Sequence, residues 1–166
     1  MKHTDGTGVP LGATESNSYI KYLFFDLGMM QTMLDIPAAE ILLASDVDFV
    51  NKGGASEMFA GLEMKKYRDC LQKPEMHYWE NTARGRRSEV DYLKTRSGKV
   101  LPVEVKANTQ GGMQSLWIFM RMRKLHEAIR TSLENFGQFD YNDPEDNFER
   151  RYVDIVPLYA LSNIEL

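Results

Sequence analysis

Residues 89–107 read EVDYLKTRSGKVLPVEVKA, and this stretch decides the fold. Two arms rich in apolar residues flank Ser97-Gly98, a dipeptide suited to a tight two-residue turn. The stretch is therefore predicted to form a β-hairpin. With Ser97 and Gly98 as the loop residues, Asp91 on the first arm faces Glu104 on the second, and Glu89 faces Lys106.

The second arm separates a charged face from an apolar one. Because side chains alternate along a strand, Glu104 and Lys106 share one face while Val103 and Val105 point into a core. Directly opposed carboxylates on Asp91 and Glu104 repel each other, and a hard divalent cation between their oxygens would remove that conflict. The pattern thus indicates a metal site. The alternative is a solvated acidic and basic strand face, whose ion pairs contribute little.

The spacing of these charges carries a family resemblance. An acid on one strand followed by Glu-x-Lys on the next resembles the PD-(D/E)xK nuclease-like superfamily, with Asp91, Glu104 and Lys106 at the three positions. More closely, the chain resembles a C-terminal domain of unknown function (family 4143) found on prokaryotic AAA-type ATPases. The matching segments, in family order, are residues 10–13, 21–30, 54–64, 78–80, 89–93, 102–107, 115–116 and 157–160.

The resemblance implies a site and a chemistry. Glu57, on the helix expected before the hairpin, matches a further acidic position of such domains. Asp91, Glu104, Glu57 and the carbonyl of Val105 would hold Mg²⁺ or Mn²⁺, and Lys106 would orient water or stabilise developing negative charge. The implied activity is metal-dependent hydrolysis of phosphodiester bonds in DNA. The alternative is a non-catalytic module that docks the ATPase, another protein or nucleic acid.

Charge is distributed unevenly along the chain. The net charge is −4, which argues against a general nucleic-acid binder, yet residues 51–130 carry an excess of Lys and Arg while both ends are acidic. A basic surface beside a carboxylate site suits contact with a phosphate backbone. Equally, it suits docking of an acidic partner. The candidate nucleic-acid-binding residues are Arg84, Arg86, Arg87, Lys94 and Arg96.

Pattern and length predict one α+β domain with a restriction-endonuclease-like core, a mixed central sheet flanked by helices. Residues 1–50 are expected to form an N-terminal lead-in and residues 51–166 the nuclease-like domain. The expected elements are a strand at 19–25, helices at 28–34, 38–44, 54–69 and 113–124, strands at 76–80 and 128–133, an acidic loop at 139–148 and an extended segment at 152–160.

Several features that the sequence lacks narrow the range of possible functions. The sequence contains no G-x-x-x-x-G-K-[ST] phosphate loop, so the ATPase of the resembling proteins is expected to lie outside this chain. Neither a long apolar run nor a signal peptide is present, which predicts a cytoplasmic protein without a membrane span. The single cysteine, Cys70, excludes an internal disulfide. His3, His77 and His126 are too scattered in sequence to suggest a histidine metal site.

Overall fold

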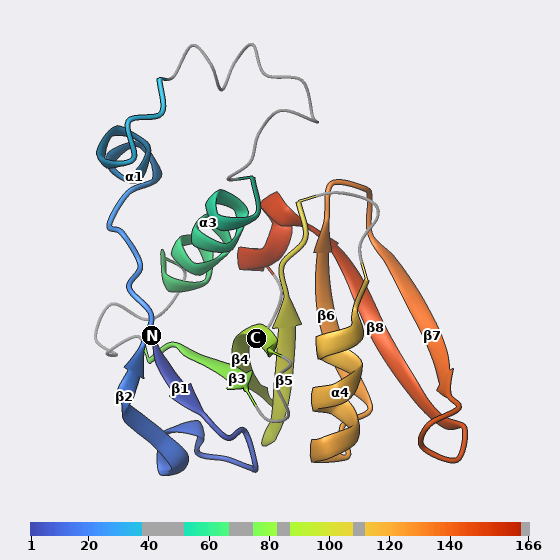
Figure 1. Ribbon diagram of the computed structural model, residues 1–166. Coiled ribbons are helices and arrows are strands. Elements are labelled where there is room, and N and C mark those ends of the chain that lie inside the picture. Colours follow the sequence, from blue (N-terminus) through green and yellow to red (C-terminus); the bar gives the residue numbers. More distant parts are fainter. Residues whose placement is uncertain (38–51, 67–74, 83–86, 108–111, 164–166) are drawn as a thin grey trace.

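An eight-stranded mixed sheet carries the fold, as the computed structural model shows (Figure 1). The structure describes residues 1–37, 52–66, 75–82, 87–107 and 112–163. The strands are β1 (Lys2–Thr4), β2 (Glu15–Ile20), β3 (His77–Asn81), β4 (Ser88–Arg96), β5 (Lys99–Glu104), β6 (Glu127–Ser132), β7 (Gly137–Asp143) and β8 (Glu149–Pro157). Their order in the sheet is β2-β1-β3-β4-β5-β6-β8-β7. The neighbours β1–β3, β5–β6 and β6–β8 are parallel, and the other pairs are antiparallel.

The β4–β5 hairpin forms as the sequence predicts. Arg96 pairs with Lys99 across the Ser97-Gly98 turn, and the register continues to Tyr92 opposite Val103. Ser97 and Gly98 both have positive φ, which matches the primed turns that suit the twist of two-residue hairpins.

Helices cover both faces of the sheet and define two cores. On one face, α3 (Lys52–Lys66) and the 3-10 helix η3 (Leu158–Asn163) pack against Tyr92, Val103 and Ile129. On the other face, α4 (Gln114–Arg123) packs against Val90 and Leu93. The mixed sheet with flanking helices is thereby confirmed. None of the described helices is long and apolar enough to cross a membrane.

The N-terminal residues contribute strands to this sheet. β1 pairs with β3 in parallel and with β2 in an antiparallel hairpin, after which α1 (Leu27–Met33) stands apart from the sheet (Figure 1). The strand expected at residues 19–25 is wrong in position, because pairing with β1 fixes the strand at Glu15–Ile20. The aromatic residues Tyr22 and Phe25, which suggested a strand, are each 88% exposed. The helix expected at residues 38–44 lies outside the described residues.

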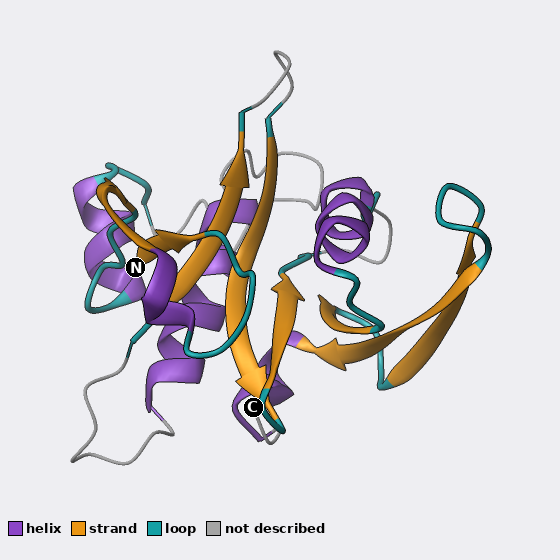
Figure 2. Ribbon diagram, turned by 90° about the horizontal axis from the view of Figure 1, so that it is seen from below, coloured by secondary structure: helices purple, strands orange, loops and turns teal. Residues whose placement is uncertain are grey.

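The C-terminal half contains a second correction. Much of the expected acidic loop at residues 139–148 is strand β7, which pairs along its whole length with β8. Figure 2 shows this β7–β8 hairpin extending away from the rest of the sheet. Alternation of Phe139 and Tyr141 with polar residues permits a strand, and the partner strand decides it. Near its end the buried Asp143 carboxylate accepts a 2.8 Å hydrogen bond from the buried Arg151 guanidinium.

Candidate metal centre

An irregularity in β4 aims Asp91 toward helix α3. Trp79 of β3 pairs with Val90, whereas His77 pairs with Leu93, so β4 holds one extra residue between these pairs. Val90 and Leu93 therefore both reach the core beneath α4, although they are three residues apart. An extra residue of this kind, a β-bulge, changes the direction in which the side chains of a strand point. Strict alternation would place Asp91 with Leu93 on the α4 face.

Three carboxylates meet on the α3 side. Ligand oxygens of Glu57, Glu89 and Asp91 all lie within 4.8 Å of one another. Tyr92 holds the helix in place, because its hydroxyl donates a 2.6 Å hydrogen bond to the Glu57 carbonyl oxygen. Gly61 makes that approach possible, since a Cβ at this position would lie 2.5 Å from the Tyr92 hydroxyl oxygen. The helix and strand thus bring Glu57 to Asp91, as the resemblance implies, and add Glu89.

Asp91 is held in a setting that disfavours its charge. Its Oδ2 accepts a 2.7 Å hydrogen bond from the amide of Val105, where regular β4–β5 pairing has ended. Burial, reinforced by the charges of Glu104 and Glu57, raises the pKa of Asp91 from 3.8 to about 7. A bound cation would relieve this electrostatic cost.

Glu104 is the most deeply buried acid of the group. It ends β5 with 5% of its surface exposed, and its Oε1 pairs with the Lys106 ammonium at 2.7 Å. Within the described part of the chain, its Oε2 has no hydrogen-bond partner. Burial raises the pKa of Glu104, while Lys106 acts in the opposite direction. A buried oxygen without a hydrogen-bond donor is able to bind a cation.

Lys106 is positioned by the neighbouring strand. Its amide donates a 2.9 Å hydrogen bond to Thr131 Oγ1, and that hydroxyl donates in turn to the Lys106 carbonyl oxygen at 3.2 Å. Thr131 is fully buried in β6. The Glu104–Lys106 pairing on one strand face agrees with the alternation in the sequence. The expected pairing of Glu89 with Lys106 is wrong, because Glu89 pairs instead with Lys21 and Arg87.

Lys21 is a site residue that the sequence reasoning missed. Its ammonium pairs with the Glu57 carboxylate at 3.0 Å and also with Glu89. It lies over the ring of Tyr78, 4.9 Å from the centroid. Lys21 thus supplies a cation to the carboxylate cluster from a segment that precedes Glu57 by 36 residues. No local spacing in the sequence links the two.

The predicted basic surface is only partly present. Lys94 is 3% exposed, so it does not belong to a phosphate-binding surface. Arg87 is exposed and pairs with Glu80 and Glu89. Arg96 pairs with Glu127 and Asp154 near the hairpin turn, at the opposite end of β4 from Asp91. Arg84 and Arg86 lie outside the described residues.

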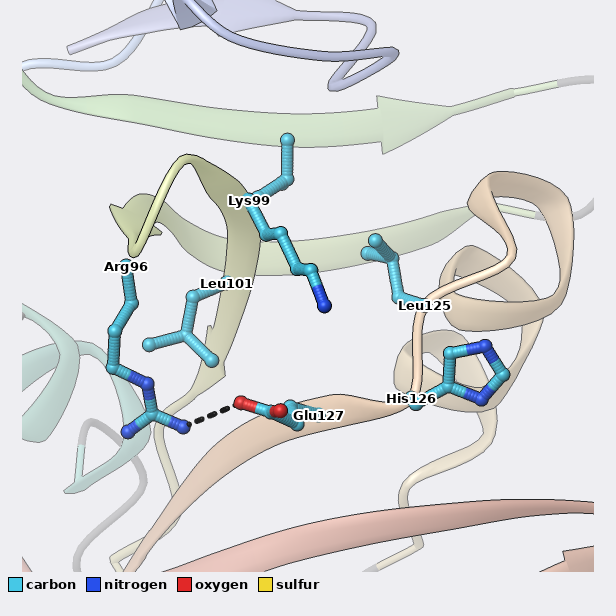
Figure 3. A pocket seen from close by; sticks show the side chains of 7 residues that line it. Arg96, Lys99, Leu101, Leu125, His126 and Glu127 are labelled. Carbon is cyan, nitrogen blue, oxygen red and sulfur yellow. Dashed lines mark hydrogen bonds and ion pairs between the residues drawn. The ribbon is translucent and has the colours of Figure 1, made fainter.

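A small pocket at that opposite end holds a different set of side chains. Figure 3 shows Arg96, Lys99 and Leu101 of the hairpin across from Leu125 and Glu127, with the ring of His126 turned away from them. Its volume of about 110 Å³ is below the several hundred Å³ usual for small-molecule sites. The carboxylate cluster is therefore the stronger candidate for chemistry.

Comparison with known proteins identifies a family whose description names no activity. The family model described as domain of unknown function (DUF4143) matches residues 52–161. No curated protein and no solved structure matches the chain. The matched range contains Glu57, Asp91, Glu104 and Lys106 and leaves Lys21 outside.

Proposed function

Because the chain belongs to the DUF4143 family, whose description specifies no activity, its function must be inferred from its site, and we propose that it is a metal-dependent nuclease-like domain. The observation that supports this is the meeting of Glu57, Glu89 and Asp91 next to the buried, half-satisfied Glu104. Four carboxylates at one end of a hairpin, with two of their pKa values raised, form a site that favours a cation.

The donor set matches a hard divalent ion. The side chains that meet in the described part of the site provide carboxylate oxygens, which suit Mg²⁺ or Mn²⁺ better than softer metals. Glu57, Asp91 and Glu104 would hold the ion, as the resemblance implies, and the role of the Val105 carbonyl stays a prediction. The ion would supply a more acidic water and neutralise charge on a phosphodiester.

Lys106 provides the chain's own contribution to hydrolysis. Its backbone is fixed by Thr131 and its ammonium by Glu104, so the positive charge is preorganised beside the carboxylates. A preorganised cation stabilises negative charge that develops on a phosphate during attack by water. The arrangement suits a phosphodiester, and DNA is the substrate class that the resemblance implies.

A non-catalytic docking module is the second candidate. Lys21 already neutralises Glu57 and Glu89, and Arg87 and Arg96 are engaged in ion pairs. Such internal pairing reduces the free positive charge available to a phosphate backbone. In that case the domain would bind an ATPase, another protein or nucleic acid without cutting it.

Titration calorimetry with Mn²⁺ separates the two candidates. The unaltered chain is expected to bind the ion, and Asp91→Ala is expected to weaken binding at least tenfold. Asp140→Ala, which removes an exposed β7 carboxylate paired with Arg150, serves as a matched control and should leave affinity unchanged. Cleavage of plasmid DNA in Mg²⁺ is then measured for the same proteins. Absence of Mn²⁺ binding to the unaltered chain would exclude the nuclease.

A further inference from the structure

A second cluster of metal-ligating side chains lies at the base of the N-terminal hairpin. Glu15 begins β2, Glu75 precedes β3 and His77 begins β3. One ligand atom from each lies within 4.8 Å of the other two. We infer that Glu15, Glu75 and His77 form a binding site for a transition-metal ion of the zinc type, separate from the carboxylate centre around Asp91.

The spacing of the three ligand atoms suits such an ion. The ligands of tetrahedral zinc lie about 2.1 Å from the metal and therefore about 3.4 Å from one another. His77 Nε2 and Glu15 Oε1 are 2.6 Å apart, so their contact must open by less than about 1 Å for an ion to enter between them. A change of this size is within the reach of glutamate rotation.

Gly12 lies beside the carboxylates of Glu15 and Glu75. A Cβ built at this glycine would lie 3.6 Å from Glu15 Oε1 and 3.8 Å from Glu75 Oε2. Both oxygens therefore face a position where every other residue type would place a side chain. A cavity of about 400 Å³ is lined by Gly12, Glu75 and His77, so two of the three proposed ligands border open space.

The residues around Glu15 orient its carboxylate. Lys2 donates a 2.6 Å hydrogen bond to Glu15 Oε2, which leaves Oε1 directed at His77. Charged partners that orient a ligating carboxylate in this way are a recurring feature of metal sites.

The ligand types separate this site from the carboxylate centre. An imidazole nitrogen with two carboxylates favours Zn²⁺, Co²⁺ or Ni²⁺, whereas a cluster of carboxylates alone favours Mg²⁺ or Mn²⁺. His77 is 4% exposed in the central sheet, and Glu15 belongs to the neighbouring hairpin. A bound ion would tie the hairpin to the sheet and stabilise the folded chain in proportion to its occupancy.

Visible absorption of Co²⁺ tests the site in the full chain, with excess Mg²⁺ present to occupy the carboxylate centre. We expect a saturable Co²⁺ spectrum that Zn²⁺ displaces, and a rise in melting temperature with Zn²⁺. Glu75→Gln, at an exposed residue, should weaken Co²⁺ binding at least tenfold. Gly12→Ala should also weaken Co²⁺ binding, because the added methyl group would contact the carboxylate oxygens of Glu15 and Glu75.

Two further variants identify the ligand and control for surface binding. His77→Gln should abolish the paramagnetically shifted imidazole resonances of the Co²⁺-loaded protein. His126→Gln is the matched control, since His126 pairs with a single glutamate, Glu149, at 3.4 Å; this variant should bind as the unaltered chain does. Asp91→Asn should likewise leave the Co²⁺ spectrum intact. Absence of Co²⁺ binding, or binding unchanged in Glu75→Gln, would reduce the cluster to an ion pair and overturn the inference.

Discussion

Replacing Asp91 with asparagine tests the electrostatic state of the candidate centre in the absence of metal. The native pKa of Asp91 is about 7, against 3.8 for an unperturbed carboxyl. Because the native carboxyl keeps its proton to a higher pH than the unfolded one, its ionisation opposes folding. The Asp91 contribution therefore favours the folded state below about pH 4 and is lost as pH rises through 7. Asparagine stays neutral throughout and keeps an oxygen to accept the Val105 amide hydrogen bond.

The expected size follows from the shift. Between about pH 5 and pH 7 the unfolded carboxyl is ionised while the native one keeps its proton, and roughly two pH units at 1.36 kcal/mol per unit correspond to about 2.7 kcal/mol. Asp91 is only partly buried, so water screens its charge and this value is an upper limit. We expect the stability advantage of Asp91→Asn over the unaltered chain to grow by about 1–2.5 kcal/mol between pH 5 and pH 8.

Urea denaturation of both proteins across this pH range, with EDTA present, provides the measurement. Comparing the two chains at each pH cancels the titration of all other groups that the substitution does not touch. A stability difference that stays constant within about 0.5 kcal/mol from pH 5 to pH 8 would refute the raised pKa and the buried, charge-crowded setting of Asp91.

Three other substitutions probe the ion pairs of the structure. Lys21→Met should raise Mn²⁺ affinity about fivefold in calorimetry, since it removes a competing cation worth roughly 1 kcal/mol; unchanged affinity would show that the ammonium does not occupy the site. Lys106→Ala should abolish Mg²⁺-dependent DNA cleavage yet retain Mn²⁺ binding, and cleavage that persists undiminished would rule out its role. Arg151→Met should cost about 1.5–3 kcal/mol in urea denaturation, because Asp143 loses one of its two guanidinium partners and keeps Arg121. The exposed Arg150→Met is the control and should leave stability nearly unchanged.

The sequence by itself determined the hairpin and its register from Arg96–Lys99 to Tyr92–Val103, whereas the predicted pairs Asp91–Glu104 and Glu89–Lys106 lie beyond the regular pairing. Ser97-Gly98 imposes a two-residue turn, and the alternation of Val103 and Val105 with Glu104 assigns the faces, because both are properties of neighbouring residues. The same local rules placed α4 and the strand that became β6. The positions Glu57, Asp91, Glu104 and Lys106 came from spacing and family resemblance, and the structure brings them to one end of the hairpin.

The tertiary structure decided what surrounds those residues. Asp91 points toward α3 because β4 holds one extra residue opposite β3. This irregularity appears only in the pairing of β3 with β4, and the sequence of β4 alone does not reveal it. Lys21 reaches Glu57, and Glu15 reaches His77, across 36 and 62 residues of chain. Contacts at such separation follow from the packing of the whole sheet, so no local pattern predicts them. For the same reason Lys94, which looks like a surface cation in the sequence, is buried once β4 takes its central place in the sheet.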